Sequence, residues 1–224
     1  MMDNKKSFDE EWEVIHSTHE WGAYPTEHVI RFIARNYYQK QRKNIRILDF
    51  GCGGGAHTWY LAREGFDVYA FDGSKSAIER AEKRLGREHL VAHFRVEDAL
   101  EVNYPDDFFD AVVDNVCVYG NIMSNINTMY KNIYRMLKPH GKLLTTCFGK
   151  QTDGYGTGEK LEKDTYVHIT EGALIDRGTT HFFDKEELES TLQKAGFSDI
   201  NIDTILYTDN HIRIEQYVAI AEKE

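Results

Sequence analysis

The chain has 224 residues, of which 41% are hydrophobic and 29% charged, and its formal net charge at pH 7 is −10. This length suits one large domain with a substantial core, and the acidic balance argues against a surface that follows nucleic-acid phosphates. No apolar run is long enough to span a bilayer, and the N-terminus lacks the apolar centre of a signal peptide. We therefore expect a cytoplasmic protein that binds neither nucleic acid nor membrane.

Residues 1–44 precede the first predicted strand and contain two helical patterns separated by a break at residues 19–25. Such a segment could form a lid over a ligand site, with Trp12, Trp21 and Tyr24 facing a cationic ligand. His19 is then a candidate for substrate contact. Packing of the same helices on a sheet is an equally open interpretation.

The stretch Ile45–His57 organises the rest of the chain. A short apolar run ends at an acid, four glycines fall within residues 51–55, and a helical pattern follows at once. Glycine suits a backbone that turns sharply and lets a ligand approach its N–H groups. The sequence therefore predicts a strand, a ligand-binding loop that includes Cys52, and a helix.

Two cofactor classes use such a loop. The spacing Gly51-x-Gly53-x-x-Ala56 fits the dinucleotide pattern. The same residues also read Asp49-x-Gly51-x-Gly53-x-Gly55. A carboxylate at this position would repel a pyrophosphate, but it could attract the ammonium and sulfonium groups of S-adenosylmethionine, directly or through water.

The acid-x-Gly-x-Gly-x-Gly pattern after a hydrophobic strand resembles the first motif of class I S-adenosylmethionine-dependent methyltransferases. Leu-Lys-Pro-x-Gly before a strand, at residues 137–141, and the phrase from Phe183 to Phe197 resemble further marks of that superfamily. The resemblance covers nearly the whole chain after residue 44. It implies an α/β fold, a Rossmann-like seven-stranded and mostly parallel sheet with an antiparallel last strand, helices on both faces and an N-terminal helical lid.

Further cofactor contacts follow the second, third and fourth predicted strands. Asp72 ends the second strand, where nucleotide-binding α/β folds place a ribose-binding carboxylate. Asp98 resembles the acid of the family that reaches the adenine amino group, and Asn115 follows the fourth strand, beside the methyl group. The predicted cofactor contacts are Asp49, Gly51, Cys52, Gly53, Asp72, Gly73, Ser74, Asp98, Ala99, Asn115, Trp21 and Tyr24.

An irregular, glycine-rich stretch at about residues 149–181 interrupts the methyltransferase-like domain of residues 45–224, with an extended segment at residues 165–169. Long loops at the carboxyl edge of such sheets are often functional, so we interpret this one as an acceptor-binding insertion. A hydroxyl or ammonium acceptor needs a general base. Candidate catalytic residues are His181, His168 and Tyr119; candidate substrate contacts are Tyr119, Tyr155, Tyr166, Arg177 and His19.

The three cysteines are interpreted as small buried residues, and no metal site is expected. We expect methyl transfer from S-adenosylmethionine to an O or N nucleophile of a small molecule, for example a sugar or a phosphorylated metabolite, by a monomer or homodimer. Two alternatives remain open: an NAD-dependent oxidoreductase, and a noncatalytic cofactor-binding partner of another methyltransferase.

Overall fold

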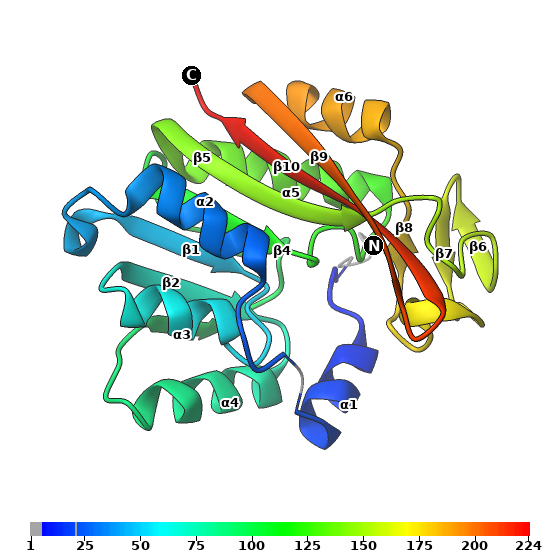
Figure 1. Ribbon diagram of the computed structural model, residues 1–224, viewed down its shortest axis with the longest axis horizontal. Helices are drawn as coiled ribbons and strands as arrows, with labels where there is room; N and C mark the ends of the chain where they lie inside the picture. Colours follow the sequence, from blue (N-terminus) through cyan, green and yellow to red (C-terminus); the bar gives the residue numbers. More distant parts are fainter. Residues whose placement is uncertain (1–5, 21) are drawn as a thin grey trace, which may run out of the picture.

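A seven-stranded sheet forms the centre of the molecule in the computed structural model, which describes residues 6–20 and 22–224 (Figure 1). Its strands are β1 (Arg46–Phe50), β2 (Asp67–Asp72), β3 (His93–Val96), β4 (Phe109–Asn115), β5 (Leu137–Phe148), β9 (Ser198–Asp209) and β10 (Ile212–Glu222). Their order is β3-β2-β1-β4-β5-β10-β9. β1 to β5 run parallel to one another, whereas β10 is antiparallel to both β5 and β9. This topology confirms the fold predicted from the sequence.

Helices cover both faces of this sheet (Figure 1). They are α2 (Glu27–Tyr37), α3 (Ala56–Arg63), α4 (Lys75–Gly86), α5 (Met123–Met136) and α6 (Lys185–Ala195), whereas α1 (Glu10–Thr18) packs against α4. Short 3₁₀ turns lie at Arg42–Asn44 and Gly172–Leu174. The apolar stripes of α2 and α3 pack with one face of β1, β2 and β4, and those of α5 and α6 form a larger core on the other face. Each fully buried large apolar side chain stabilises the fold by about 1.5–3 kcal/mol.

The glycine loop, residues 51–55, connects β1 to α3. Two of its positions leave no room for a side chain. Gly51 has a φ of +70°, and a Cβ there would lie 2.2 Å from Cys117 Sγ. Gly55 has a φ of +74°, and its Cβ would lie 2.6 Å from Ala81 Cβ on α4. Glycine alone therefore allows the turn and the close packing of the loop.

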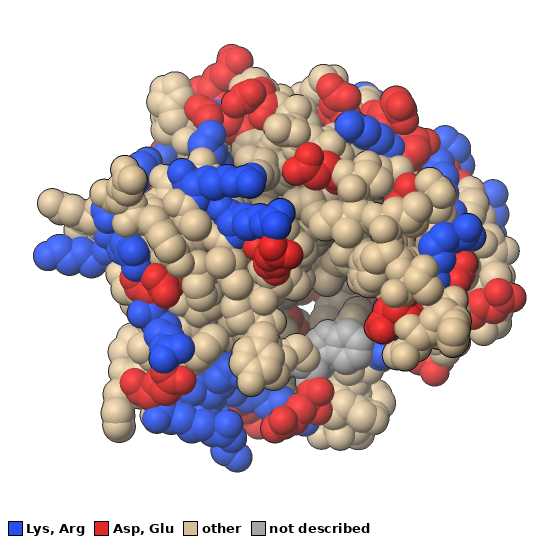
Figure 2. All heavy atoms as spheres, viewed as in Figure 1, with Lys and Arg blue, Asp and Glu red and all other residues tan. Residues whose placement is uncertain are grey.

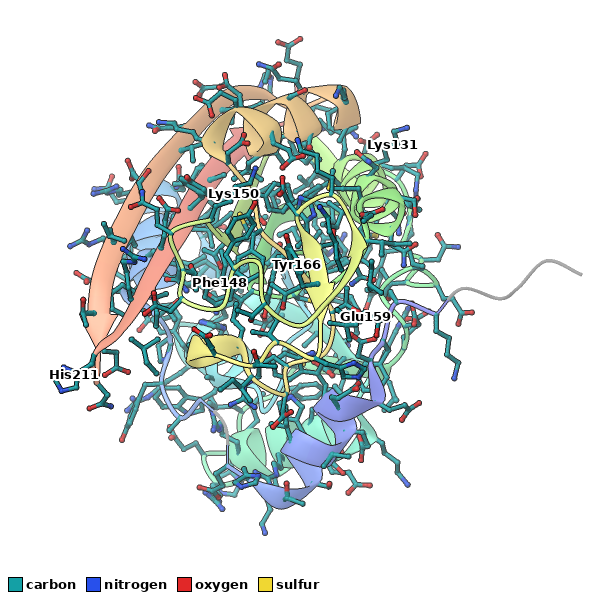
Figure 3. The ribbon with its side chains drawn as sticks, turned by 90° about the vertical axis from the view of Figure 1, so that its right-hand side faces the viewer. Lys131, Phe148, Lys150, Glu159, Tyr166 and His211 are labelled. Atoms are coloured by element: carbon teal, nitrogen blue, oxygen red, sulfur yellow. The ribbon has the colours of Figure 1, made fainter. Side chains whose placement is uncertain are left out.

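The segment between β5 and α6 forms a separate antiparallel sheet of β6 (Glu159–Glu162), β7 (Thr165–Val167) and β8 (Thr180–His181). Lys150 fastens this insertion, because its Nζ lies 2.7 Å from Asp164 Oδ2 and 2.9 Å from Asp184 Oδ2. Figure 3 looks onto the insertion, with Lys150 and Tyr166 near its middle.

One predicted boundary is wrong. The strand expected to follow the Leu-Lys-Pro-x-Gly stretch of residues 137–141 already begins at Leu137, and that stretch lies inside β5 as an irregularity. The register shows the reason, since Phe109 of β4 pairs with Leu137 but Ala111 pairs with Lys142. No helix within residues 6–20 and 22–224 is long and apolar enough to cross a membrane.

Candidate functional site

A cavity of about 250 Å³ opens at the carboxyl ends of β1, β2 and β4. The glycine loop forms its floor, while α1 and the segment leading into α2 cover it. The space-filling view shows a hollow near the centre of this face (Figure 2). Parallel α/β sheets bind ligands at this edge.

Asp72 is the charged group nearest the glycine loop on the cavity wall. Its Oδ2 accepts a hydrogen bond of 2.8 Å from the Gly53 N–H, and its Oδ1 accepts one of 2.9 Å from the Ser74 N–H. Burial raises the pKa of Asp72, although these two hydrogen bonds oppose that shift. A carboxylate with remaining lone pairs at the end of β2 is well placed to accept hydrogen bonds from a ribose diol.

Apolar groups form the wall beyond Asp72. Phe71 and Ala99 line the cavity there, together with Phe8 and Gly73. A flat apolar slot beside a diol-binding acid fits an adenosine moiety.

Asp49 lies beneath the loop and does not line the cavity. Its side chain is 1% exposed, and Thr58 Oγ1 donates a hydrogen bond of 2.5 Å to its Oδ2. Burial raises the pKa of Asp49 to about 7. Of the two contacts expected from the sequence, direct or through water, this burial disfavours the direct one. In the structure Asp49 fixes Thr58 and the start of α3.

Asp98 is occupied by the N-terminal segment. Ser7 donates to it from both its N–H and its Oγ, at 2.8 and 2.6 Å, and the Phe8 N–H donates at 3.0 Å. The Phe8 ring lies against Gly73, where a Cβ would be 2.3 Å from Phe8 Cδ2. The acid expected to reach adenine holds the lid in this structure, because four donors, including the Leu100 N–H, already saturate it.

Helix α1 is fastened to the N-terminal end of α4. Glu13 accepts hydrogen bonds of 2.5 Å from both Ser74 Oγ and Ser76 Oγ, and a longer one of 3.3 Å from the Ser76 N–H. Carboxylates are favoured at such a helix N-terminus. This anchor presents one face of α1, carrying Asp9, Trp12 and His16, to the cavity.

His16 is a cavity residue that the sequence interpretation did not select. Its side chain is 4% exposed, and its Cε1 lies 3.3 Å from the position a Gly53 Cβ would take. Its Nδ1 has no hydrogen-bond partner among the described residues. Burial lowers the pKa of His16, against the attraction of Asp72, so a neutral ring with a buried nitrogen faces the loop. The only pattern in the sequence that could have indicated this position is the spacing of Trp12 and His16, which places both residues on one face of a helix.

An uncharged polar wall closes the cavity beside β4. His28 Nε2 lies 2.7 Å from Asn115 Oδ1, and the Thr26 N–H donates to His57 Nε2 at 3.3 Å. Burial lowers the pKa of His57 to about 4 and also lowers that of His28. Both rings are therefore neutral at pH 7.

Of the three predicted catalytic residues, Tyr119 alone lines the cavity. His181 is fully buried, with Nδ1 2.7 Å from Thr165 Oγ1 and Nε2 3.3 Å from Glu187 Oε2. His168 has a side chain that is 73% exposed, near Glu159 on the outer edge of the insertion. Both histidines lie away from the cavity, so their geometry gives them no access to an acceptor there.

The other predicted contacts divide in the same way. The cavity brings together Gly51, Cys52, Gly53, Asp72, Gly73, Ala99, Asn115, Tyr24 and Tyr119. Ser74 caps α4 through its side chain, and the Tyr155 hydroxyl donates to Asp164. The cavity lining does not include Ser74, Tyr155, Tyr166, Arg177 or His19. Trp21 lies outside the described residues.

A glycine loop after β1, an acid at the end of β2 and a lidded cavity at the carboxyl edge define a Rossmann-like nucleotide-binding protein. Residues 47–141 match the family model described as a methyltransferase domain. Residues 47–141 therefore match a methyltransferase domain, and the strand order agrees with the fold of the class I S-adenosylmethionine-dependent methyltransferases.

Two curated relatives illustrate the range of similarity. Ubiquinone biosynthesis O-methyltransferase of Rickettsia akari is 28% identical over 133 residues, covering 59% of this chain and 51% of that protein. Phosphoethanolamine N-methyltransferase 2 of Caenorhabditis elegans is 26% identical over 215 residues, covering 90% of this chain and 46% of that protein. The chain thus spans about half the length of these relatives.

Solved structures support the fold. A methyltransferase from Methanosarcina mazei superposes with a TM-score of 0.70 at 24% identity, covering 85% of this chain and 96% of that chain. Phosphoethanolamine N-methyltransferase 2 of Haemonchus contortus, in complex with S-adenosyl-L-methionine, gives a TM-score of 0.68 at 19% identity and covers 96% of this chain and 56% of that chain.

Proposed function

We propose that this chain is an enzyme that transfers a methyl group from S-adenosylmethionine to an O or N nucleophile of a small molecule. The observation that carries the proposal is the placement of Asp72 beside the Gly51–Gly54 backbone in a lidded cavity at the carboxyl edge of the sheet. Bound S-adenosylmethionine supplies an electrophilic methyl carbon. The proposal includes a cytoplasmic location and a monomeric or homodimeric state.

The residues of the chain have distinct tasks in this proposal. Asp72 accepts hydrogen bonds from the ribose hydroxyls, and Phe71 and Ala99 pack against the purine. The α1 lid excludes water and restricts the acceptor to the space beside Tyr119. Alignment of acceptor and methyl group then supplies much of the rate enhancement, because well-oriented reactants avoid an entropic cost of up to about 7–11 kcal/mol.

The relatives do not define the acceptor atom. By name, they include O-methyltransferases and C-methyltransferases of ubiquinone biosynthesis and N-methyltransferases of phosphoethanolamine. The acceptor class must therefore be argued from the cavity of this chain.

The proposed function is tested by calorimetric titration of S-adenosylhomocysteine into the wild type and the Asp72→Asn variant. Replacing the Asp72 carboxylate by an amide should raise the Kd of S-adenosylhomocysteine at least tenfold, because one hydrogen bond to a charged group contributes about 1.5–3 kcal/mol. Asp67→Asn is the matched control, because Asp67 begins the same strand at its far end and pairs with Arg46. Equal affinity of the wild type and Asp72→Asn for S-adenosylhomocysteine, with unchanged melting temperatures, would contradict the assignment of this cavity as the cofactor site.

A further inference from the structure

The charges around the cavity are unbalanced. Among the described residues that line it there are two carboxylates, Asp9 and Asp72, and no lysine or arginine. Basic side chains of this face include a group near α4 (Figure 2), where Lys83 and Arg87 border an adjoining hollow that shares Tyr24 and Gly54 with the cavity. The charged side chains of the lining itself thus favour a cationic ligand over an anionic one.

Asp9 lines the cavity where it meets the segment just before β8. Its Oδ2 accepts a hydrogen bond of 2.5 Å from the Thr179 N–H, and a Cβ on Gly178 would lie 2.4 Å from the same oxygen. The Thr179 carbonyl in turn lies 3.5 Å from the position of a Gly120 Cβ, just past Tyr119. The chain therefore holds the Asp9 carboxylate beside the space that the acceptor must occupy.

No cationic side chain among the described residues forms an ion pair with Asp9. The charge of Arg177 lowers the pKa of Tyr119 against the larger effect of burial, but Arg177 does not line the cavity. Burial raises the pKa of Asp9, as expected for a carboxylate that lacks a counter-ion. A cationic ligand would offset the free-energy cost of burying the ionised Asp9 carboxylate.

Two further groups of α1 point to a ligand in the cavity. His16, about two turns beyond the N-cap residue Asp9, faces Gly53 and has a buried Nδ1 without a partner among the described residues. The Trp12 ring lies between them on α1 and lines the cavity. Aromatic faces attract ammonium ions by about 0.5–2 kcal/mol.

We infer, resting on the proposed function, that the acceptor is a small amine that binds as its ammonium ion between Asp9 and Tyr119 and is methylated on nitrogen. This assignment narrows the acceptor from any O or N nucleophile to a cationic nitrogen compound, and it differs from the sugar or phosphorylated metabolite named as examples from the sequence.

The proton balance of the reaction follows from the position of Asp9. Asp9 accepts one proton from the ammonium ion and leaves the free amine. The nitrogen lone pair forms the N–C bond to the methyl carbon as the C–S bond breaks, which leaves a neutral thioether and a methylammonium product. The proton on Asp9 then passes to water, so each turnover releases one proton.

The test uses the full-length protein saturated with S-adenosylhomocysteine, whose neutral sulfur does not repel an ammonium ion. Benzylamine, benzyl alcohol and benzoate are titrated in parallel, and so are ethylamine, ethanol and acetate. The amine of at least one set should bind at least tenfold more tightly than its matched alcohol or carboxylate. The same amine should accept the labelled methyl group from S-adenosylmethionine.

Asp9→Asn is the diagnostic variant, because asparagine still accepts the Thr179 N–H bond and the Asp9 side chain makes no helix-capping hydrogen bond. This variant should weaken amine binding about tenfold and leave alcohol binding unchanged. Glu10→Gln, which removes an exposed carboxylate one residue further along the chain, should change neither.

Tighter binding of a carboxylate, the absence of any preference for an amine, or unchanged amine affinity in Asp9→Asn would overturn the inference. Retained S-adenosylhomocysteine binding in those cases would leave the methyltransferase proposal intact. Failure of the wild type to bind S-adenosylhomocysteine would instead remove the proposed function.

Discussion

Removing the Glu13 carboxylate should open the lid and weaken cofactor binding. Glu13 on α1 receives three hydrogen bonds from Ser74 and Ser76 at the start of α4. In the Glu13→Ala variant these donors turn to water, and α1 loses its principal polar contact with the nucleotide-binding half of the molecule.

The magnitude follows from the contact and its exposure. A net hydrogen bond to a charged group contributes about 1.5–3 kcal/mol, but a partly exposed carboxylate retains only a fraction of that. We assign about 1.4 kcal/mol to the three hydrogen bonds of Glu13 together. Their loss would lower the equilibrium constant for closure of α1 over the cavity about tenfold. Where closure limits retention of the cofactor, the Kd rises by the same factor.

The assay is calorimetric titration with S-adenosylhomocysteine, with stopped-flow measurement of its dissociation rate. Glu13→Ala should raise the Kd about tenfold, mainly through faster dissociation. Glu10→Ala, on the exposed side of the same turn, serves as the control for helix propensity and net charge. Equal affinity in Glu13→Ala and the wild type, or an equal loss in both variants, would refute the anchoring role.

Two further predictions concern stability. Gly51→Ala should lower the free energy of unfolding in urea by about 2–3 kcal/mol, because its Cβ would overlap Cys117 Sγ in addition to the left-handed backbone strain. Gly65→Ala, at a φ of +84° with open space around it, should lose only about 1 kcal/mol, and equal losses would contradict the steric argument. Asp49 has a pKa of about 7 in the fold against 3.8 in the unfolded chain, so its stabilising contribution is complete below pH 3.8 and disappears as the pH rises through about 7. The wild type should therefore lose about 1.4 kcal/mol per pH unit relative to Asp49→Asn between pH 5 and 6, and parallel stability profiles would show that Asp49 is already ionised.

The sheet and the glycine loop could be predicted because their signals are local. The acid-glycine pattern, the apolar runs and the acid at Asp72 each specify their own strand or turn, so their places in the fold follow from a few neighbouring residues. The boundary of β5 was missed because the irregularity at residues 138–141 depends on pairing with β4, which no local pattern encodes.

The lid side of the site could not be predicted from such patterns. His16 and Asp9 reach the cavity only because Glu13 and Ser7 bind partners about sixty and ninety residues away. His181 looked available in a polar loop, but Thr165 and Glu187 take both of its ring nitrogens once β8 and α6 come together. The hydrogen-bonding groups of polar residues in a long insertion can thus be used in tertiary contacts that local sequence patterns do not predict.

Parallel titration of the wild type with S-adenosylmethionine, S-adenosylhomocysteine and NAD tests the central claim most directly. The account predicts binding of both adenosyl ligands in the micromolar range, typical of cofactor sites, and no binding of NAD. Binding of NAD without either adenosyl ligand would contradict it and make this chain a dinucleotide-binding protein.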